Sequence, residues 1–286
     1  MSESIAESIL EATRVLQSAG IAEARREAGS LLERVIDRDR TFIISHAEQP
    51  LTSEQSQIFR NFVARRARGE PLQYITGIQA FFGLDFEVTT DVLIPRPETE
   101  LLVERALELI DDRQTAPLIC DVGTGSGCIT IALLHELPHV SAVALDASPL
   151  ALGVARRNAA RHAVTERVTF FESDCYSGLS EENPRFDLIV SNPPYIATEA
   201  IATLQTEVRD HEPRLALAAG PDGLQMIKRL ISESGYFLKQ EGQLLIEIGF
   251  DQAAAVENLI NLNKWKLVGI HKDLQGIPRL AELQKP

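Results

Sequence analysis

The sequence predicts an α/β protein in which a small helical domain precedes a doubly wound sheet. Two observations support this prediction. From Pro117 onward, short unbroken apolar segments alternate with helical segments, which is typical of buried parallel strands joined by crossover helices. Residues 1–70, in contrast, show only helical periodicity. The chain has 286 residues, of which 44% are hydrophobic, and this is enough apolar material for one large and one smaller core.

Three helices are expected in the N-terminal domain. Apolar residues over Ile5–Ala19 recur at helical spacing, and a second helix is expected over 22–35. A third is expected over 52–67, because Thr52 and Gln55 match a capping box at its start. The N-terminal domain is therefore expected to be entirely helical.

Residues 71–95 differ from the helical segments before them. They are rich in aromatic and β-branched side chains, and Gly77 and Gly83 punctuate them, so a β-hairpin or extended connector is expected. A helix is then expected over Thr99–Asp111. It opens the larger domain, which is expected to span residues 96–286.

The larger domain is expected to alternate strands with helices. The expected strands are Leu118–Val122, Ala142–Leu145, Val168–Phe171, Leu188–Val190, Leu244–Ile248, Trp265–Ile270 and Leu280–Leu283. The expected helices are Ile129–Leu137, Pro149–His162, Leu224–Lys239 and Gln252–Leu262. Ser148 and Pro149 suit the cap and first turn of one of them.

The net charge of −13 argues against general affinity for nucleic acid. An acidic chain is not attracted to phosphate backbones, so the charge suits a basic protein or a small molecule better. We therefore expect no direct contact with nucleic acid. No run of about 18 apolar residues exists, so no membrane span is expected. We also expect a monomer.

Cysteine and histidine usage indicates neither disulfides nor metal. Cys120, Cys128 and Cys175 are odd in number and form no C-x-x-C pair, which favours a reducing compartment and a cytoplasmic location. Met1–Leu10 lacks the basic-then-apolar pattern of a signal peptide. The six histidines show no metal-ligand spacing, so no metal site is expected.

A glycine-rich loop follows the first expected strand and opens a helix. Its residues are Gly123, Thr124, Gly125, Ser126 and Gly127. Glycines let the chain turn sharply and let a ligand approach the backbone. Asp146 ends the next strand, where its carboxylate is expected to accept hydrogen bonds from ribose hydroxyls. A dinucleotide loop reads G-x-G-x-x-G; here the third glycine comes one residue early, and Asp121 precedes the loop. This spacing favours the methyltransferase loop over a dinucleotide site or a tight turn without ligand.

A rigid segment, Asn192-Pro193-Pro194-Tyr195, follows the expected strand Phe186–Ser191. It lies at the carboxyl end of the strand, where open α/β sheets bind ligands. The two prolines have φ fixed near about −65°, and Asn192 is pushed to an extended conformation by the proline after it. The Pro193 carbonyl keeps acceptor capacity, and neither proline adds an N–H group. The alternative reading is a stiff turn without function.

This segment suits the alkylation of a planar amide or amino nitrogen. Such a nitrogen is a weak nucleophile, because its lone pair is delocalised, and it carries two N–H donors. The Asn192 side-chain oxygen and the Pro193 carbonyl are expected to accept both donors and to aim the lone pair at a methyl donor. Fixing the attack geometry lowers a barrier by at most about 7–11 kcal/mol. Tyr195 is expected to stack on the planar group.

Several segments together resemble the release factor glutamine methyltransferase family, called PrmC or HemK. The segments are Pro71–Gly77, Val92–Glu100, Asp121–Gly127, Asn192–Ile196, Glu212–Pro213, Ala216–Leu217 and Pro221–Leu224. The segment Arg96–Glu100 and its spacing to Asn192 are more specific than the glycine loop. The resemblance runs from about residue 70 to Arg279.

The resemblance implies a fold and a reaction. The fold is a seven-stranded Rossmann-like class I methyltransferase sheet with a small N-terminal helical domain. The reaction is methylation, with S-adenosyl-L-methionine, of the side-chain amide nitrogen (N5) of glutamine in the Gly-Gly-Gln motif of class I peptide chain release factors. Such a protein is a transferase that acts in translation termination.

The resemblance also implies roles for individual residues. Those expected to hold the cofactor are Gly123, Thr124, Gly125, Ser126, Gly127, Asp146, Asp174, Cys175 and Asn192. Those expected to hold the glutamine are Asn192, Pro193, Pro194 and Tyr195, of which Asn192 and Pro193 are expected to be catalytic. The family commonly has an aromatic residue where this chain has Cys175, so the contact with adenine is expected to differ. Arg96–Glu100 is expected to cover the cofactor pocket.

Three other functions fit parts of the pattern. An adenine-N6 nucleic-acid methyltransferase would use the same Asn192 chemistry on a flipped base, but the acidic charge opposes it. A nicotinamide-dependent oxidoreductase is opposed by the early third glycine. An adaptor without catalysis is opposed by the presence of Asn192. The fate of a labelled methyl group separates the first from the family's reaction, and binding of S-adenosylhomocysteine rather than NAD separates the second.

Overall fold

The computed structural model describes residues 3–110, 116–180 and 185–286, and these form two compact units. The first unit comprises the chain up to Ile78 together with Gln205–His211. The second comprises Gln79–Leu204 and Glu212–Pro286. The first unit is therefore discontinuous in the sequence. The boundaries expected near residues 70 and 95 stay predictions about which segments fold independently.

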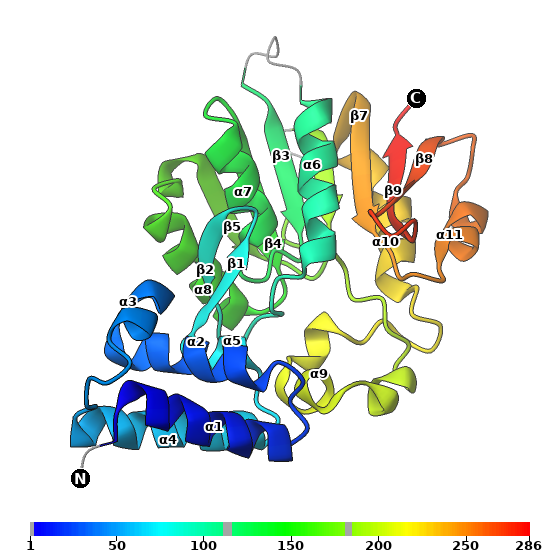
Figure 1. Cartoon of the computed structure of the whole chain (residues 1–286). Helices are drawn as coiled ribbons and strands as arrows, with labels where there is room; N and C mark the ends of the chain where they lie inside the picture. Colours follow the sequence, from blue (N-terminus) through cyan, green and yellow to red (C-terminus); the bar gives the residue numbers. More distant parts are fainter. Residues whose placement is uncertain (1–2, 111–115, 181–184) are drawn as a thin grey trace. The chain divides into compact units, whose positions relative to one another are not determined.

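The first unit is helical (Figure 1). Its helices are α1 (Ile5–Ser18), α2 (Ala24–Ile36), α3 (Arg40–Ser45), α4 (Ser53–Ala67), α5 (Leu72–Thr76) and α9 (Thr206–His211). The expected capping box at Thr52 is confirmed, because its hydroxyl accepts from Gln55 N while the Gln55 side chain accepts from Thr52 N. A core of buried residues that includes Leu16, Leu31 and Phe59 joins α1, α2 and α4.

The segment after α4 corrects one expectation. Tyr74 and Ile75 resemble strand residues in the sequence, but they lie in helix α5, where both are buried. Burial against the helical core outweighs the local preference of these residues. Gly77, with φ of 78°, ends α5, and the expected hairpin follows as β1 (Ile78–Phe81) and β2 (Leu84–Glu87).

A seven-stranded sheet forms the centre of the second unit, as predicted. Its strands are β3 (Leu118–Val122), β4 (Ser141–Asp146), β5 (Val168–Glu172), β6 (Phe186–Ser191), β7 (Leu238–Glu247), β8 (Lys266–Lys272) and β9 (Pro278–Gln284). The spatial order is β5-β4-β3-β6-β7-β9-β8. The first five of these run parallel, and β9 runs antiparallel to β7 and β8. The carboxyl ends of the parallel strands therefore share one edge.

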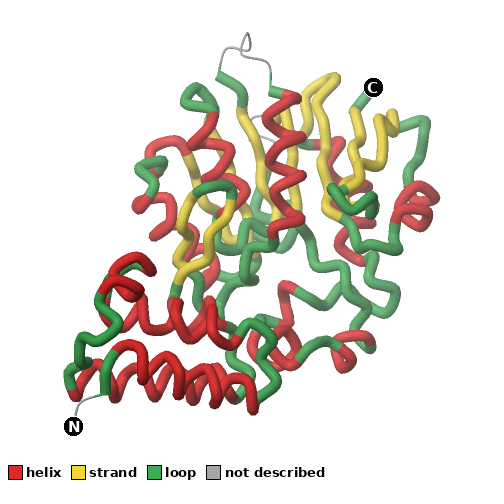
Figure 2. Tube along the Cα trace, in the orientation of Figure 1, coloured by secondary structure: helices red, strands yellow, loops and turns green. Residues whose placement is uncertain are grey.

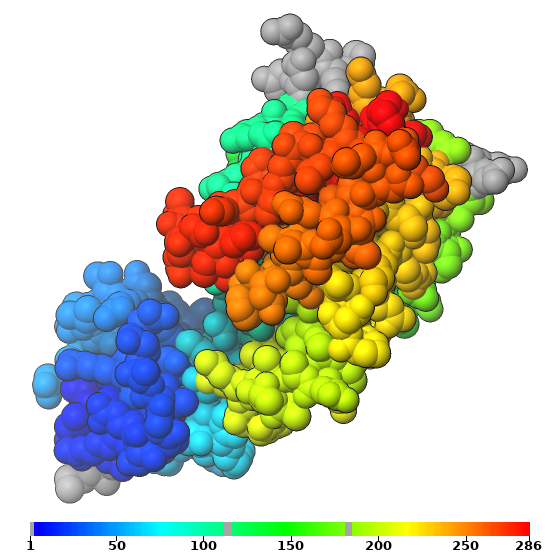
Figure 3. Space-filling model, turned by 90° about the vertical axis from the view of Figure 1, so that its right-hand side faces the viewer, coloured from blue at the N-terminus to red at the C-terminus, as the bar shows by residue number. Residues whose placement is uncertain are grey.

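Helices cover both faces of the sheet, which makes the unit doubly wound (Figure 2). They are α6 (Glu100–Leu109), α7 (Cys128–Glu136), α8 (Pro149–Arg161), α10 (Gln225–Glu233) and α11 (Ala253–Leu259). Side chains alternate along each strand: Ile119 belongs to the buried cluster that includes residues of α6 and α7, whereas Cys120 belongs to the cluster that includes residues of α10 and α11. One face of this unit is formed by α11, β8 and the hairpin after it, drawn in orange and red (Figure 3).

Two helical expectations need correction. The helix expected over Leu224–Lys239 ends earlier, because α10 stops at Glu233 and β7 begins at Leu238. The helix expected over Thr99–Asp111 is α6, and Asp111 lies outside the described residues. In the part of the chain that the structure describes, no helix is long and apolar enough to cross a membrane.

Candidate active site

A cavity of about 180 Å³ lies at the carboxyl ends of β3, β4, β5 and β6. Most of the residues predicted for the site line it. They are Gly123, Thr124, Gly125, Ser126, Asp146, Asp174, Cys175, Asn192, Pro193 and Pro194. Gly127 and Tyr195 do not line it. The strand ends thus bring together residues from distant parts of the sequence.

The three loop glycines have two different tasks. Gly123 and Gly125 have φ of 79° and 54°, and a Cβ atom on either would meet nothing within 4 Å. They therefore leave open backbone for a ligand. Gly127 has φ of 82°, and its Cβ would lie 2.9 Å from Ile131 Cδ1. The third glycine is needed for close packing at the start of α7.

Asp121 braces the loop from inside the protein. It is fully buried, and its Oδ2 accepts hydrogen bonds from the hydroxyls of Thr124 at 2.8 Å and Thr130 at 2.7 Å. Its Oδ1 has no hydrogen-bond partner among the described residues. Burial raises the pKa of Asp121 from 3.8 to about 6. Asp121 therefore shapes the loop without lining the cavity.

Asp146 lies at the end of β4 with acceptor capacity to spare. Its Oδ2 accepts from Gly125 N and its Oδ1 from Ser148 N, both at 2.8 Å. A carboxylate has about four lone-pair sites, so acceptor positions remain at the cavity wall. Burial raises the pKa of Asp146 above its usual 3.8. These acceptors and the open glycine backbone fit the ribose and methionine parts of S-adenosylmethionine.

Asn192 follows β6 with its amide oriented. Its Nδ2 donates to Thr99 Oγ1 at 2.9 Å. Neither its Oδ1 nor the Pro193 carbonyl takes part in any hydrogen bond among the described residues, so both acceptors stay available. The Tyr195 carbonyl, in contrast, accepts from Gln252 Nε2 at 3.0 Å, which anchors the far end of the segment.

The Tyr195 ring is partly buried against the core cluster that includes residues of β6, β7 and α10. Burial raises the pKa of its hydroxyl to about 12, so the ring stays neutral. Because Tyr195 does not line the cavity, its expected stacking on a planar substrate stays a prediction.

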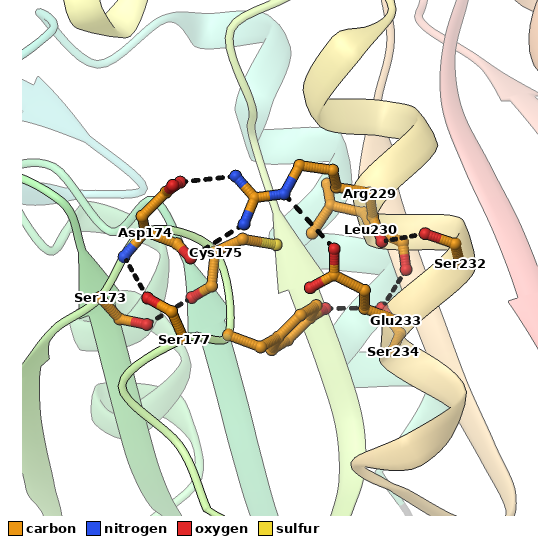
Figure 4. Close-up of polar contacts among 10 residues, drawn as sticks. Ser173, Asp174, Cys175, Ser177, Arg229, Leu230, Ser232, Glu233 and Ser234 are labelled. Atoms are coloured by element: carbon orange, nitrogen blue, oxygen red, sulfur yellow. Dashed lines mark hydrogen bonds and ion pairs between the residues drawn. The ribbon is translucent and has the colours of Figure 1, made fainter.

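The loop after β5 holds Asp174 and Cys175 against α10 (Figure 4). Arg229 donates from Nη1 to Asp174 Oδ1 at 2.6 Å and from Nη2 to the Asp174 carbonyl at 3.1 Å. Ser173 Oγ donates to the Cys175 carbonyl at 2.7 Å. Cys175 has φ of 55°, which is uncommon for a residue with a side chain. Its contribution to the wall is a compact neutral thiol, because burial raises its pKa to about 12.

Two residues of the segment Arg96–Glu100 reach the cavity, and its role as a cover for the cofactor stays a prediction. Arg96 and Thr99 line the cavity. Arg96 Nη2 pairs with Glu212 Oε1 at 2.6 Å, and Glu100 accepts from Phe82 N at 2.9 Å. The segment is thus attached at its first residue to Glu212, 116 positions away, and at its last to the hairpin that precedes it.

Two buried residues lie behind Asn192: Thr99 belongs to the segment expected to cover the pocket, but its contact with Asn192 was not predicted, and Glu247 had no predicted role. Thr99 is 2% exposed and is the hydrogen-bond acceptor for Asn192. Glu247 ends β7, is 3% exposed, and its Oε2 has no hydrogen-bond partner among the described residues. Burial raises the pKa of Glu247 to about 7, and hydrogen bonds with Thr99 and Tyr195 lower it in part. A glutamate ending a buried strand was the only available signal.

Comparison with known proteins agrees with this geometry. The family profiles "PrmC N-terminal domain" and "Methyltransferase small domain" match residues 7–77 and 98–214. A solved structure, the human methyltransferase 10 domain containing protein, has a TM-score of 0.53 at 19% identity, covering 79% of this chain and 96% of that one. The sheet order, the glycine loop and Asp146 define a class I, S-adenosylmethionine-dependent methyltransferase.

Full-length relatives define the family more closely. The release factor glutamine methyltransferase of Geobacter sulfurreducens is 42% identical over 274 residues, covering 96% of this chain and 94% of the relative. That of Koribacter versatilis is 41% identical over 275 residues, covering 96% of both chains. The chain belongs to the release factor glutamine methyltransferase family, and its cofactor is S-adenosylmethionine.

Proposed function

We propose that this enzyme methylates the side-chain amide nitrogen (N5) of the glutamine in the Gly-Gly-Gln motif of class I peptide chain release factors. One observation carries the proposal: the Asn192 Oδ1 and the Pro193 carbonyl are both available as acceptors at the wall of the cofactor cavity. A primary amide offers two N–H donors in one plane, which is what two fixed acceptors bind.

Different residues around the cavity bind the cofactor and orient the substrate. Bound S-adenosylmethionine supplies a methyl group on a positively charged sulfur. Gly123, Gly125 and Asp146 would hold it through backbone and carboxylate contacts. Asn192 and Pro193 orient the glutamine amide: a bond from its nitrogen to the methyl carbon would form as the sulfur–methyl bond breaks, S-adenosylhomocysteine would leave, and one N–H proton would pass to water. Acceptors that are already in place need no reorganisation as positive charge develops on the nitrogen.

We also propose a cellular location, an oligomeric state and a kind of partner for the enzyme. We place the enzyme in the cytoplasm as a monomer without direct contact to nucleic acid. The buried free thiols of Cys120, Cys128 and Cys175 support a reducing compartment. The net charge of −13 supports a protein substrate over a polyanionic one.

Mass spectrometry tests the proposal directly. Release factor is incubated with the enzyme and labelled S-adenosylmethionine, then digested and sequenced. We expect one labelled methyl group on the glutamine of the Gly-Gly-Gln motif. Label in DNA or RNA and none in release factor would overturn the proposal and establish the adenine-N6 alternative.

A further inference from the structure

The acceptor of the Asn192 hydrogen bond is the buried hydroxyl of Thr99. Asn192 Nδ2 donates to Thr99 Oγ1 at 2.9 Å, and Thr99 is 2% exposed. Thr99 ends the 3₁₀ turn Pro97–Thr99, whose backbone is closed by a hydrogen bond from Thr99 N to the Arg96 carbonyl at 3.1 Å. The acceptor is therefore a short, buried side chain on a closed turn.

This hydrogen bond decides which end of the Asn192 amide is left for a substrate. An amide has a donor end and an acceptor end of nearly equal size. With Nδ2 bound to Thr99, Oδ1 remains available as an acceptor. A flipped amide would present N–H donors to a substrate amide that brings its own donors, and binding would be lost.

A hydroxyl group alone does not enforce this choice, because it both donates and accepts. Glu247 supplies the missing constraint. It is 3% exposed at the end of β7, next to Thr99 and Tyr195, and it does not line the cavity. An ionised carboxylate only accepts, so it draws the Thr99 hydroxyl hydrogen and leaves the Thr99 oxygen to accept from Asn192.

We propose that Thr99 and Glu247 are positioning residues that together lock the Asn192 amide with its oxygen toward the substrate nitrogen. This inference rests on the proposed role of Asn192 as an acceptor and adds the two residues that orient it. Glu247 acts through Thr99, and neither residue contacts the reacting atoms. Protonation of Glu247 makes it a donor. The Thr99 hydroxyl can then donate to the Asn192 amide, so the amide orientation is no longer fixed.

Two of the titratable side chains near Glu247 are neutral, and two are charged. Its charged and titratable neighbours include Glu98, Cys128, Tyr195 and Arg279. Burial raises the pKa of Cys128 and of Tyr195 to about 12, so both stay neutral. Arg279 favours the ionised form of Glu247 and Glu98 opposes it. Because Glu247 itself has a pKa of about 7, the lock is expected to loosen on the acid side of neutrality.

Substitutions at Thr99 test the lock. Thr99→Val keeps the shape and removes the hydroxyl, so we expect kcat to fall roughly tenfold, as for the loss of one hydrogen bond. Affinity for S-adenosylhomocysteine, measured by calorimetry, should stay within about twofold. Thr99→Ser should restore most of kcat, and Thr203→Val, at an exposed hydroxyl outside the cavity, should change nothing. A kcat for Thr99→Val within about twofold of wild type would overturn the proposal.

The pH profile tests Glu247. Wild-type kcat should decline as the pH falls below about 7, because protonated Glu247 no longer holds the Thr99 hydroxyl hydrogen. Glu247→Gln cannot change its charge, so its acid limb should shift to lower pH, where Asp121, with a pKa of about 6, still titrates. An identical acid limb in both proteins would contradict the role of Glu247.

A substrate-free measurement separates this inference from the proposed function. The side-chain NH₂ resonances of Asn192 report its orientation in the free protein. One sharp pair in the wild type that broadens by exchange in Thr99→Val would support the lock, even if release factor proved not to be the substrate. Unchanged resonances in Thr99→Val would overturn the lock, even if release factor were methylated normally.

Discussion

At the residue scale, single acceptor atoms determine what the cavity does. We expect Asn192→Ala to keep its affinity for S-adenosylhomocysteine within about threefold and to lose turnover by roughly 10²-fold or more, as when a preorganised electrostatic contact is removed. Calorimetry and the rate of labelled methyl transfer measure the two quantities. Asn263→Ala, at an exposed turn, is the matched control. Near-normal turnover in Asn192→Ala would refute the acceptor role.

Substitution of Asp146 should lower cofactor affinity, whereas substitution of Asn192 should lower turnover. Asp146→Asn removes the charge and leaves one oxygen for the two backbone donors, Gly125 N and Ser148 N, that the carboxylate now binds. Affinity for S-adenosylhomocysteine should therefore fall more than about tenfold, because charge-assisted hydrogen bonds are lost. Glu172→Gln, on an exposed residue at the end of the neighbouring strand, is the control, and equal affinities in both variants would contradict the assignment.

Glu247 should also leave a signature in stability. Its pKa is about 7 in the folded chain against 4.5 ordinarily, so unfolding releases a proton between these values. Stability is therefore lost as the pH rises through this window. Relative to Glu247→Gln, the wild type should lose on the order of 1–3 kcal/mol between about pH 5 and pH 8. Urea unfolding at the two pH values measures the difference, and parallel changes in both proteins would contradict the expectation.

At the element scale, the glycine loop should respond differently at each glycine. Gly127→Ala places a Cβ against Ile131 at a φ of 82°, so the fold should lose at least about 1–2 kcal/mol. Gly125→Ala carries a similar backbone cost, but its Cβ points into open space in the cavity. It should therefore also lower the affinity for the cofactor. Gly29→Ala, inside α2 with free space around it, should stabilise slightly. Urea unfolding and calorimetry distinguish the three, and equal effects would contradict the division of tasks.

The sheet elements were the most predictable part of the fold. All seven expected strands are present, because buried parallel strands require continuous apolar segments such as Leu118–Val122. The short helices α3 and α9 were not foreseen. Helices of about six residues are too short to show an apolar stripe, and α5 carries strand-type residues that tertiary burial holds in a helix.

The candidate site was predictable only where local sequence defines it. The glycine loop, Asp146 and Asn192 each end a strand, so their shared edge follows from the alternation of elements. The pairing of Asn192 with Thr99 joins residues 93 positions apart, and the contact between Arg229 and Asp174 spans 55. Such pairs depend on how helices dock onto the sheet, which a single sequence does not encode in a readable pattern.

At the scale of the whole molecule, a buried ion pair holds the discontinuous first unit together. Arg66 is 4% exposed and binds both Glu27 of α2 and Glu207 of α9, the latter at 2.6 Å. Arg66→Ala should cost about 3 kcal/mol, near the lower end for a broken buried pair, because Glu207 is 39% exposed. Hydrogen exchange should accelerate in α4 and α9 while cofactor affinity stays constant. Arg60→Ala, whose partner Glu3 is exposed, is the control, and equal exchange in both would contradict the prediction.

The membership of Gln205–His211 in the first unit has a consequence for the order of events during synthesis. A ribosome delivers the chain from its N-terminus, so α1 to α5 emerge long before the stretch that supplies Glu207. Until then Arg66 has Glu27 as its acidic partner but lacks the second carboxylate. The first unit therefore gains its second carboxylate at Arg66 only after the four strands β3 to β6 have been translated.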